Sequence, residues 1–356
     1  AARHGKPLGD RGRRFRRTFR GDPAVYRAGR LGLVAAVIAL ASRSLIVFGS
    51  PALRSALIVI FALLLTAALS LSTLFQRVEL WLGDAQQRLV AREMQFEQTL
   101  LVDIDEESLR RLEPYLGVWP YKRDIYALVV DYLSELGVHT VCFDVLMSER
   151  RPGDQQLARA VERHPATVFA ALALSYPLPH DDERRRRLER LSWSLPAGLG
   201  AESWADFNLP VIAEASKPGG GVGIASLWPD VDGSVRRVPL FHRARDAVLP
   251  ALALATTVAG SGRQSVDYDS ERQQVRLDGH VWPVDDSGRV LLSFPRNTDA
   301  VKSIPFYLLA LAAMGATAAP VERDWVKGRT VIVGSTAVQT DAVHTPRGLV
   351  PGAYLL

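Results

Sequence analysis

Only one cysteine, Cys142, occurs among the 356 residues, so no intrachain disulfide can form and the fold must hold without one. It lies in the apolar run Val141-Cys142-Phe143, which is typical of a small core residue rather than a reactive thiol. The single cysteine therefore indicates nothing about the compartment in which the protein works.

Signatures of nucleotide- and metal-dependent enzymes are also missing. There is no G-x-x-x-x-G-K phosphate loop, and the glycines around residue 220 lack the spacing of a dinucleotide-binding loop. Neither an H-E-x-x-H helix nor a G-x-S-x-G nucleophile elbow occurs, and the seven histidines have no metal-ligand spacing. The sequence thus predicts no catalytic residue, no metal site and no cofactor, which makes a stand-alone enzyme the weakest hypothesis.

Positive charge is confined to the start of the chain. Residues 1–30 hold ten basic and two acidic side chains, a charge of +8, and subtracting this from the total of +5 leaves −3 for the other 326 residues. Such a tail could bind nucleic acid. Because it precedes an apolar stretch and has no interleaved aromatic pattern, we interpret it as a cytoplasmic flank and expect no nucleic-acid partner.

Residues 55–75 contain no charged side chain. As a helix they would span roughly 31 Å at about 1.5 Å per residue, close to the hydrocarbon thickness of a bilayer. A buried helix of a globular protein is rarely apolar on every face over this length. We therefore predict a transmembrane helix over 55–75.

A second apolar segment, 31–54, is interrupted by Arg43 and ends near Pro51 and Arg54. If it also spans the membrane, the two helices form a hairpin and the globular part returns to the cytoplasm. If it lies in the membrane interface, the globular part is outside. Basic residues prefer the cytoplasmic side, which favours one span and an extracytoplasmic domain over 100–356.

The first part of the globular region alternates strands and helices. A charged connector helix is expected over 76–99, followed by a buried strand at 100–105 and a short helix at 106–113 with Asp105 as its N-cap. A strand at 140–145, a helix that is capped by Asp154 and runs to about residue 164, and a strand at 167–174 come next. Apolar side chains recur with helical spacing over 123–136, at Ile125, Leu128, Val129, Tyr132, Leu133 and Leu136. This order predicts a parallel βαβ core.

The remaining segments are more varied. Residues 177–210 hold four prolines and a mixed-charge run, which favours a surface insertion. Strands at 222–228 and 235–242 flank Asp232-Gly233, a hairpin signal. A helix is expected at 248–259, short strands over 265–294, a helix at 303–315 and a final buried strand at 330–334. The predicted class is α/β: a mixed sheet with a parallel βαβ core flanked by helices and an antiparallel part, preceded by a transmembrane helix.

Carboxylates follow two of the predicted parallel strands. Asp103 and Asp105 lie at the end of the first strand and Asp144 at the end of the second. The first two strands are expected to be neighbours in the sheet, which would bring these side chains close together. Ligands of doubly wound sheets bind beyond the carboxyl ends of the strands, so this cluster could hold a cation or the amino or hydroxyl groups of a solute. The structural alternative has Asp105 capping a helix and Asp144 paired with an arginine such as Arg123.

Four groups of segments carry a family resemblance. They are 102–109 (VDIDEESL); 119–123 (WPYKR) with the following helix; 143–145 (FDV) with 154–158 (DQQLA); and 230–240 (DVDGSVRRVPL) with 331–337 (VIVGSTA) and 341–348. In this order they resemble the type-two CHASE domain, an extracellular sensor associated with cyclases and histidine kinases. Within these segments, the predicted ligand-binding residues are Asp103, Asp105, Arg123, Asp144, Asp154 and Arg236.

The resemblance implies a bacterial inner-membrane receptor with a periplasmic or extracellular sensor. Its cytoplasmic output would be a nucleotide cyclase, a histidine kinase or a serine/threonine kinase. The expected partners are the membrane, an unidentified small-molecule or protein signal, and a second copy of the chain in a homodimer. The alternative function is an envelope module that binds or assembles proteins without a small ligand, which predicts an exposed apolar patch and no enclosed polar pocket.

Overall fold

The structure is a computed structural model that describes residues 50–70, 73–179, 181–213, 221–297, 300–316, 321–337 and 342–352. The predicted basic tail and residues 31–49 of the apolar segment lie outside the described residues. The chain divides into two compact units, Ala1–Leu82 and Gly83–Leu356.

The first unit contains helix α2 (Pro51–Ser70) and the first turns of helix α3 (Thr73–Val90). Proline suits the first position of α2 because it fixes φ and lacks an N–H that would be unpaired there. Among the residues that the structure describes, no helix is both long and apolar enough to cross a membrane. The transmembrane helix predicted over 55–75 is therefore not confirmed. The predicted connector helix ends at Val90, and an irregular segment leads from it to the sheet.

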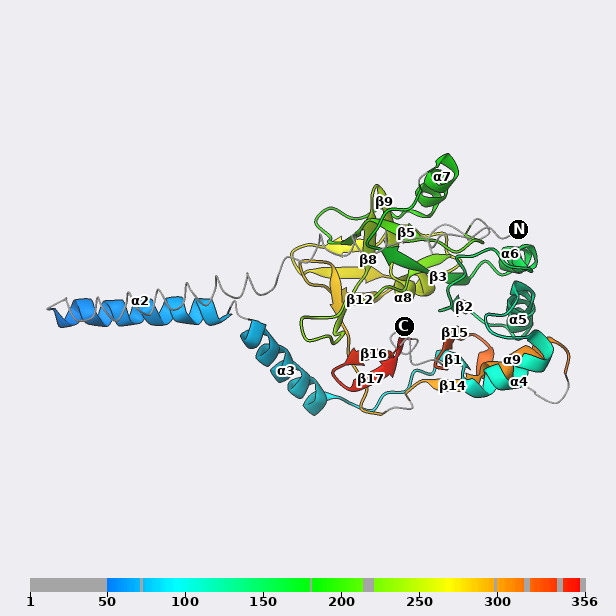
Figure 1. Cartoon of the computed structure of the whole chain (residues 1–356), viewed down its shortest axis with the longest axis horizontal. Helices are drawn as coiled ribbons and strands as arrows, with labels where there is room; N and C mark the ends of the chain where they lie inside the picture. The colour runs from blue at the N-terminus through cyan, green and yellow to red at the C-terminus, as the bar shows by residue number, and fades with distance from the viewer. Residues whose placement is uncertain are drawn as a thin grey trace, which may run out of the picture. The chain divides into compact units, whose positions relative to one another are not determined.

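The second unit is built on a seven-stranded sheet in the order β14-β1-β15-β2-β3-β5, with β6 also paired to β3 (Figure 1). All these pairs are parallel except β3 with β5. The strands are β1 (Thr99–Ile104), β2 (Thr140–Phe143), β3 (Thr167–Leu174), β5 (Asp206–Asn208), β6 (Val222–Ile224), β14 (Lys302–Pro305) and β15 (Thr330–Ser335). The α/β class and the parallel core are thus confirmed.

The order of the central strands differs from the prediction. β15 lies between β1 and β2, with Val333 opposite Val102 on one side and Phe143 on the other. The prediction that the first two strands are neighbours was therefore wrong. Consecutive parallel strands are adjacent in most sheets, but a later strand can lie between them, as β15 does here. The carboxyl ends of β1 and β2 are consequently one strand apart.

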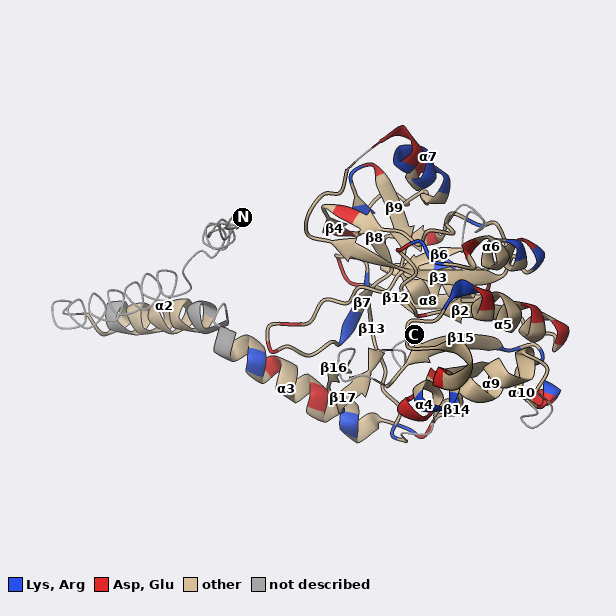
Figure 2. Cartoon of the chain, turned by 45° about the vertical axis from the view of Figure 1, so that its right-hand side comes forward, with Lys and Arg blue, Asp and Glu red and all other residues tan. Residues whose placement is uncertain are grey.

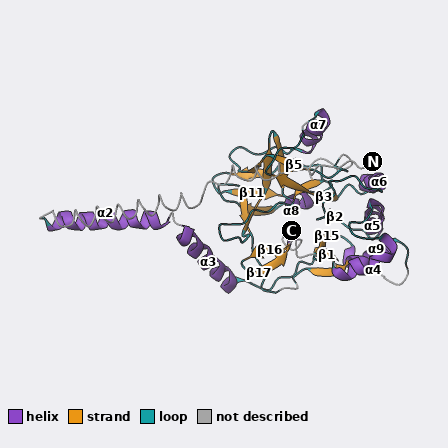
Figure 3. Cartoon of the chain, in the orientation of Figure 1, coloured by secondary structure: helices purple, strands orange, loops and turns teal. Residues whose placement is uncertain are grey.

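Helices cover both faces of the sheet, as continuous apolar strands require (Figure 3). Leu100, Val102 and Ile104 of β1 point into a core with one set of helices: α4 (Glu106–Leu116), α5 (Arg123–Glu135), α6 (Asp154–Arg163) and α9 (Phe306–Ala313). Leu101 points to the other face, where it shares a cluster with Cys142 and with α8 (Leu252–Thr257). Burial raises the pKa of the Cys142 thiol to about 12, which agrees with its predicted role as a core residue.

Helix α5 presents a slightly rotated face. Ile125, Val129 and Leu133 are buried as predicted, but Leu128 is 44% exposed. Tyr126 and Val130 are buried instead. The apolar face of α5 therefore extends to Tyr126 and Val130 and leaves out Leu128, because α5 packs against α6 and α9 as well as the sheet.

Short strands form the rest of the unit, largely in antiparallel pairs. They are β4 (Glu202–Trp204), β8 (Phe241–Ala244) and β9 (Ala247–Pro250); β10 (Asp267–Asp269), β11 (Gln274–Leu277) and β12 (His280–Pro283); β7 (Arg237–Pro239) with β13 (Arg289–Leu291); and β16 (Ala342–Thr345) with β17 (Gly348–Pro351). The β4–β8 pair is parallel. The antiparallel part and the short strands expected over 265–294 are present.

Two local predictions need correction. Asp232-Gly233 forms a turn but no hairpin, because β6 pairs with β3 and β7 pairs with β13. Segment 177–210 is not only a surface insertion. Its helix α7 (Asp182–Leu191) displays mixed charge on its surface (Figure 2) yet buries Leu188 and Leu191. Phe207, in strand β5 of the sheet, is fully buried in the same apolar cluster.

Candidate functional site

A cavity of about 560 Å³ opens at the carboxyl edge of the parallel strands. Asp144 directly follows β2, and Ser335 is the last residue of β15. The remaining lining residues come from the loop between α4 and α5, the loop after β2, strand β3, strand β6 and the segment after it, strands β7 and β8, the start of α8 and the last hairpin. They are Trp119, Pro120, Val145, Leu146, Leu172, Ile224, Ala225, Ser226, Leu227, Val238, Pro239, His242, Ala251, Leu252, Ala253, Val343 and Gly352. This is the edge where ligands of doubly wound sheets bind.

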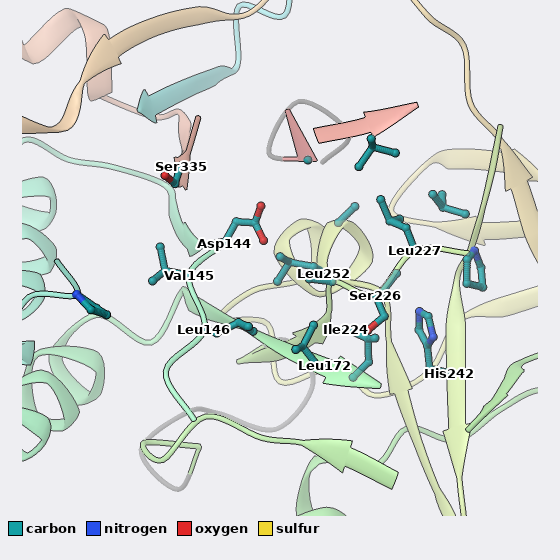
Figure 4. Close-up of a pocket in the computed structure, with 18 of the residues that line it drawn as sticks. Asp144, Val145, Leu146, Leu172, Ile224, Ser226, Leu227, His242, Leu252 and Ser335 are labelled. Carbon is teal, nitrogen blue, oxygen red and sulfur yellow. The ribbon is translucent and has the colours of Figure 1, made fainter. Parts of the chain in front are cut away.

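Few polar side chains line the cavity, and they stand on different walls (Figure 4). The Asp144 carboxylate points into the space, while Ser226 and His242 lie on the opposite side. The Ser226 hydroxyl accepts a hydrogen bond from the backbone N–H of Ala173 at 2.9 Å. The Ser335 hydroxyl donates to the carbonyl of Ile104 at 3.0 Å. These bonds fix two hydroxyls at the edge of an otherwise mostly apolar cavity.

His242 is a neutral group in this cavity. It is 1% exposed, and burial lowers the pKa of its imidazole to about 3. The indole Nε1–H of Trp204 donates to His242 Nδ1 at 3.1 Å. Because an indole N–H can only donate, Nδ1 must accept, and the single proton of the neutral ring resides on Nε2. Sequence reasoning missed His242, because nothing around a lone histidine in a short strand marks it as part of a cavity.

The three predicted strand-end carboxylates have different roles. Asp103 accepts bonds from the backbone N–H of Thr336 at 3.1 Å and from its hydroxyl at 2.7 Å. Burial raises the pKa of Asp103, against the effect of those two bonds. Asp105 accepts from the Ser108 N–H at 2.7 Å and is the N-cap of α4, as predicted. Of the three, only Asp144 lines the cavity.

Arg123 and Asp154 form a framework pair away from the cavity lining. Their Nε and Oδ1 atoms lie 3.7 Å apart, and Arg123 is buried. Desolvation lowers the pKa of the Arg123 guanidinium. The partner of Arg123 is thus Asp154 and not Asp144 as suggested. Asp154 is also not the helix cap: it is the first residue of α6, and its Oδ2 accepts from the Arg151 N–H at 2.9 Å.

Arg236 holds together three carboxylates. Its guanidinium donates to both oxygens of Asp84 at 2.7 Å, to Asp230 at 3.0 Å and to Asp232 at 2.7 and 2.9 Å. These bonds raise the pKa of Arg236, and the bonds to Asp84 have the largest effect. The hydrogen bonds that Arg236 donates to Asp232 lower the pKa of this carboxyl group to about 2. Because Asp84 belongs to α3, Arg236 fastens the end of this helix to the domain.

Two further side chains, Gln87 and Arg88, fasten α3. The Gln87 amide donates to the carbonyl of Leu292 at 2.8 Å, and Arg88 Nε donates to the carbonyl of Pro346 at 2.9 Å. The strands beside these anchors also line the cavity, through Val238 of β7 and Val343 of β16. The end of α3 is therefore bonded to the same two segments that form part of the cavity wall.

Among the described residues, no group of three or more histidine, cysteine, aspartate or glutamate side chains could hold a metal ion. Comparisons with curated proteins and with solved structures give no match. A family model described as the CHASE2 domain matches residues 56–356. Its span covers the sheet, the cavity and the anchors of α3. The chain therefore belongs to the CHASE2 family of extracellular sensor domains, as its motifs suggested.

Proposed function

We propose that the chain is the membrane anchor and extracytoplasmic sensor of a bacterial signalling receptor. The uncharged residues 55–75 would cross the inner membrane, with the tail of residues 1–30 in the cytoplasm and the domain in the periplasm. The charge of +8 on that tail supports this orientation, as does the family of extracellular sensors. The output would be a nucleotide cyclase or a kinase, and the receptor would act as a homodimer.

The proposal that a signal passes from the cavity to helix α3 is supported by the attachment of α3 to the cavity wall. Arg236 binds Asp84 two residues before Val238, which lines the cavity. Arg88 binds the carbonyl that directly follows β16. A ligand that shifts β7 or β16 would therefore shift the bonds that orient α3. The signal is a change in the population of two α3 arrangements that differ in affinity for the ligand.

The orientation can be tested with reporter fusions. Alkaline phosphatase fused after Leu100 is expected to be active, because it would fold outside the cytoplasm, where disulfides form. β-Galactosidase fused at the same position is expected to be inactive.

A fusion of alkaline phosphatase after Asp22, within the basic tail, is the matched control and should be inactive. An inactive phosphatase together with an active galactosidase after Leu100 would contradict the proposal, because it places the domain in the cytoplasm as a membrane hairpin would.

A further inference from the structure

One hydrogen-bond donor in the cavity has no partner among the described residues. His242 lines the cavity and is 1% exposed, and its proton resides on Nε2 because Nδ1 accepts from Trp204. No described oxygen or nitrogen accepts a hydrogen bond from this N–H. A buried donor without an acceptor is unfavourable, so a ligand that places an acceptor beside Nε2 gains a hydrogen bond without displacing one within the protein.

A second donor lies on the same side of the cavity. The Ser226 oxygen is held by the backbone N–H of Ala173, and its own O–H can still donate. Figure 4 shows Ser226 and His242 across the space from Asp144. Asp144 interacts within the chain, whereas the two donors across from it are matched by no described acceptor. This side of the cavity therefore favours a ligand that accepts hydrogen bonds.

The rest of the lining favours an uncharged, apolar body. Leu172, Ile224 and Leu252 lie around the space (Figure 4), and its volume of about 560 Å³ suits a small organic molecule. No lysine or arginine is among the lining residues, so a carboxylate ligand would lose its hydration without gaining a counter-charge. An ammonium group has only donors and would leave the His242 N–H unpaired.

We propose that the cavity binds a neutral apolar molecule through a carbonyl oxygen, as in a ketone, an ester or a lactone, which accepts a hydrogen bond from His242 Nε2. The body of the ligand packs against Leu172, Ile224 and Leu252, and Ser226 supplies a second donor on the same side. Because Trp204 fixes the tautomer, the donor is in place before the ligand arrives. This assignment rests on the proposed sensor function and names the class of its signal.

The test uses the full chain in detergent and four probes, each a phenyl ring with a branched group of the same size. Acetophenone carries a carbonyl oxygen, α-methylstyrene has no polar atom, benzoate is an anion and 1-phenylethylamine is a cation. Dissociation constants are measured by calorimetric titration. Acetophenone is expected to bind, and both charged probes are expected to bind about tenfold or more weakly, because a charged group must give up its hydration.

His242→Phe removes the donor and keeps a ring of similar size. It should weaken the binding of acetophenone by about fivefold or more, the effect of losing one hydrogen bond, and leave α-methylstyrene unchanged. Comparing the two proteins with the same probe cancels the hydration of the probe and its partition into detergent. His280→Phe is the matched control. This histidine also packs against a tryptophan, Trp282, but it is exposed and outside the cavity lining, so acetophenone binding should not change.

The carbonyl stretching band of bound, isotope-labelled acetophenone reports the hydrogen bond directly, and the wild type alone provides this test if His242→Phe does not fold. In the wild type the band should lie at lower wavenumber than in cyclohexane, because a hydrogen bond to the oxygen weakens the C=O bond. In His242→Phe the band should move back toward its position in cyclohexane.

The proposal is overturned if acetophenone does not bind, if either charged probe binds as tightly, if His242→Phe weakens α-methylstyrene as much as acetophenone, or if the band of the bound ketone matches that in cyclohexane. A band that stays fully shifted in His242→Phe would assign the bond to another donor and overturn the role of His242. Ketone binding with an inactive phosphatase fusion would refute the periplasmic placement alone, whereas an active fusion without ketone binding would refute the ligand class alone.

Discussion

Replacing Arg236 with methionine is expected to lower the free energy of unfolding of the domain by about 3–5 kcal/mol. The guanidinium is 6% exposed and neutralises Asp84, Asp230 and Asp232. Without it, three carboxylates remain close together in a poorly solvated place, where their charges repel one another and lose the hydrogen bonds that the guanidinium donated. Chemical denaturation followed by tryptophan fluorescence measures the loss.

Arg237→Met is the matched control. This neighbour is 40% exposed, and its nearest carboxylate oxygen, on Asp285, lies 3.8 Å away. An exposed pair at that distance contributes less than about 1 kcal/mol. Equal losses in the two variants would mean that the Arg236 cluster does not stabilise the domain. Hydrogen exchange over 83–90 should also rise in Arg236→Met, because the helix loses its strongest attachment.

The same cluster predicts how stability depends on pH. The pKa of Asp232 is about 2 in the folded domain, below its value of about 3.9 in an unfolded chain. Its contribution is therefore complete above about pH 4 and is lost as the pH falls toward 2. In Arg236→Met this contribution is absent, so the stabilities of the wild type and the variant should converge as the pH falls through that window.

Leu133→Ala is expected to destabilise the domain by about 2–5 kcal/mol, because the side chain is fully buried and its removal leaves a cavity. It packs in the core that α5 shares with the sheet and α9. Rigid aromatic neighbours such as Tyr126 and Phe143, whose rings pack edge to face 5.7 Å apart, limit how far this core can collapse.

Leu128→Ala on the same helix provides the comparison. It makes the same chemical change at a side chain that is 44% exposed, and should cost less than about 1 kcal/mol. Both variants are measured by the same denaturation experiment. If Leu128→Ala cost as much as Leu133→Ala, α5 would be rotated toward the face that its sequence periodicity alone predicts.

Local features of the fold were predictable from the sequence. The apolar run of β3 has the predicted bounds, 167–174, and Asp105 caps α4 as its position before a helix suggested. Such features depend on neighbouring residues and on backbone propensity. The burial of Phe207 was not predictable from the sequence. It packs in one cluster with Leu188 and Leu191 of α7, and the many charged residues of α7 obscure these two apolar side chains in the sequence.

The site was only partly predictable. The rule that ligands bind at the carboxyl ends of parallel strands led to Asp144, which lines the cavity. It also grouped Asp103 with Asp144, because no local signal indicates that β15 separates their strands. His242, Ser226 and Leu252 meet in the cavity through tertiary packing, and their sequence neighbourhoods carry no shared pattern.

The place of β15 in the sheet has a consequence for synthesis and export. A chain that emerges with its N-terminus first completes β1 and β2 long before residues 330–335 are available, although Leu100 must pair with Val331. Until then, the edges of β1 and β2 that will pair with β15 have unpaired backbone groups and can pair with strands of other chains. Closing so long a loop is slow, so the emerging domain should need protection by chaperones until residues 330–335 are released. A truncation before Thr330 would remove the centre of the sheet rather than shorten its end.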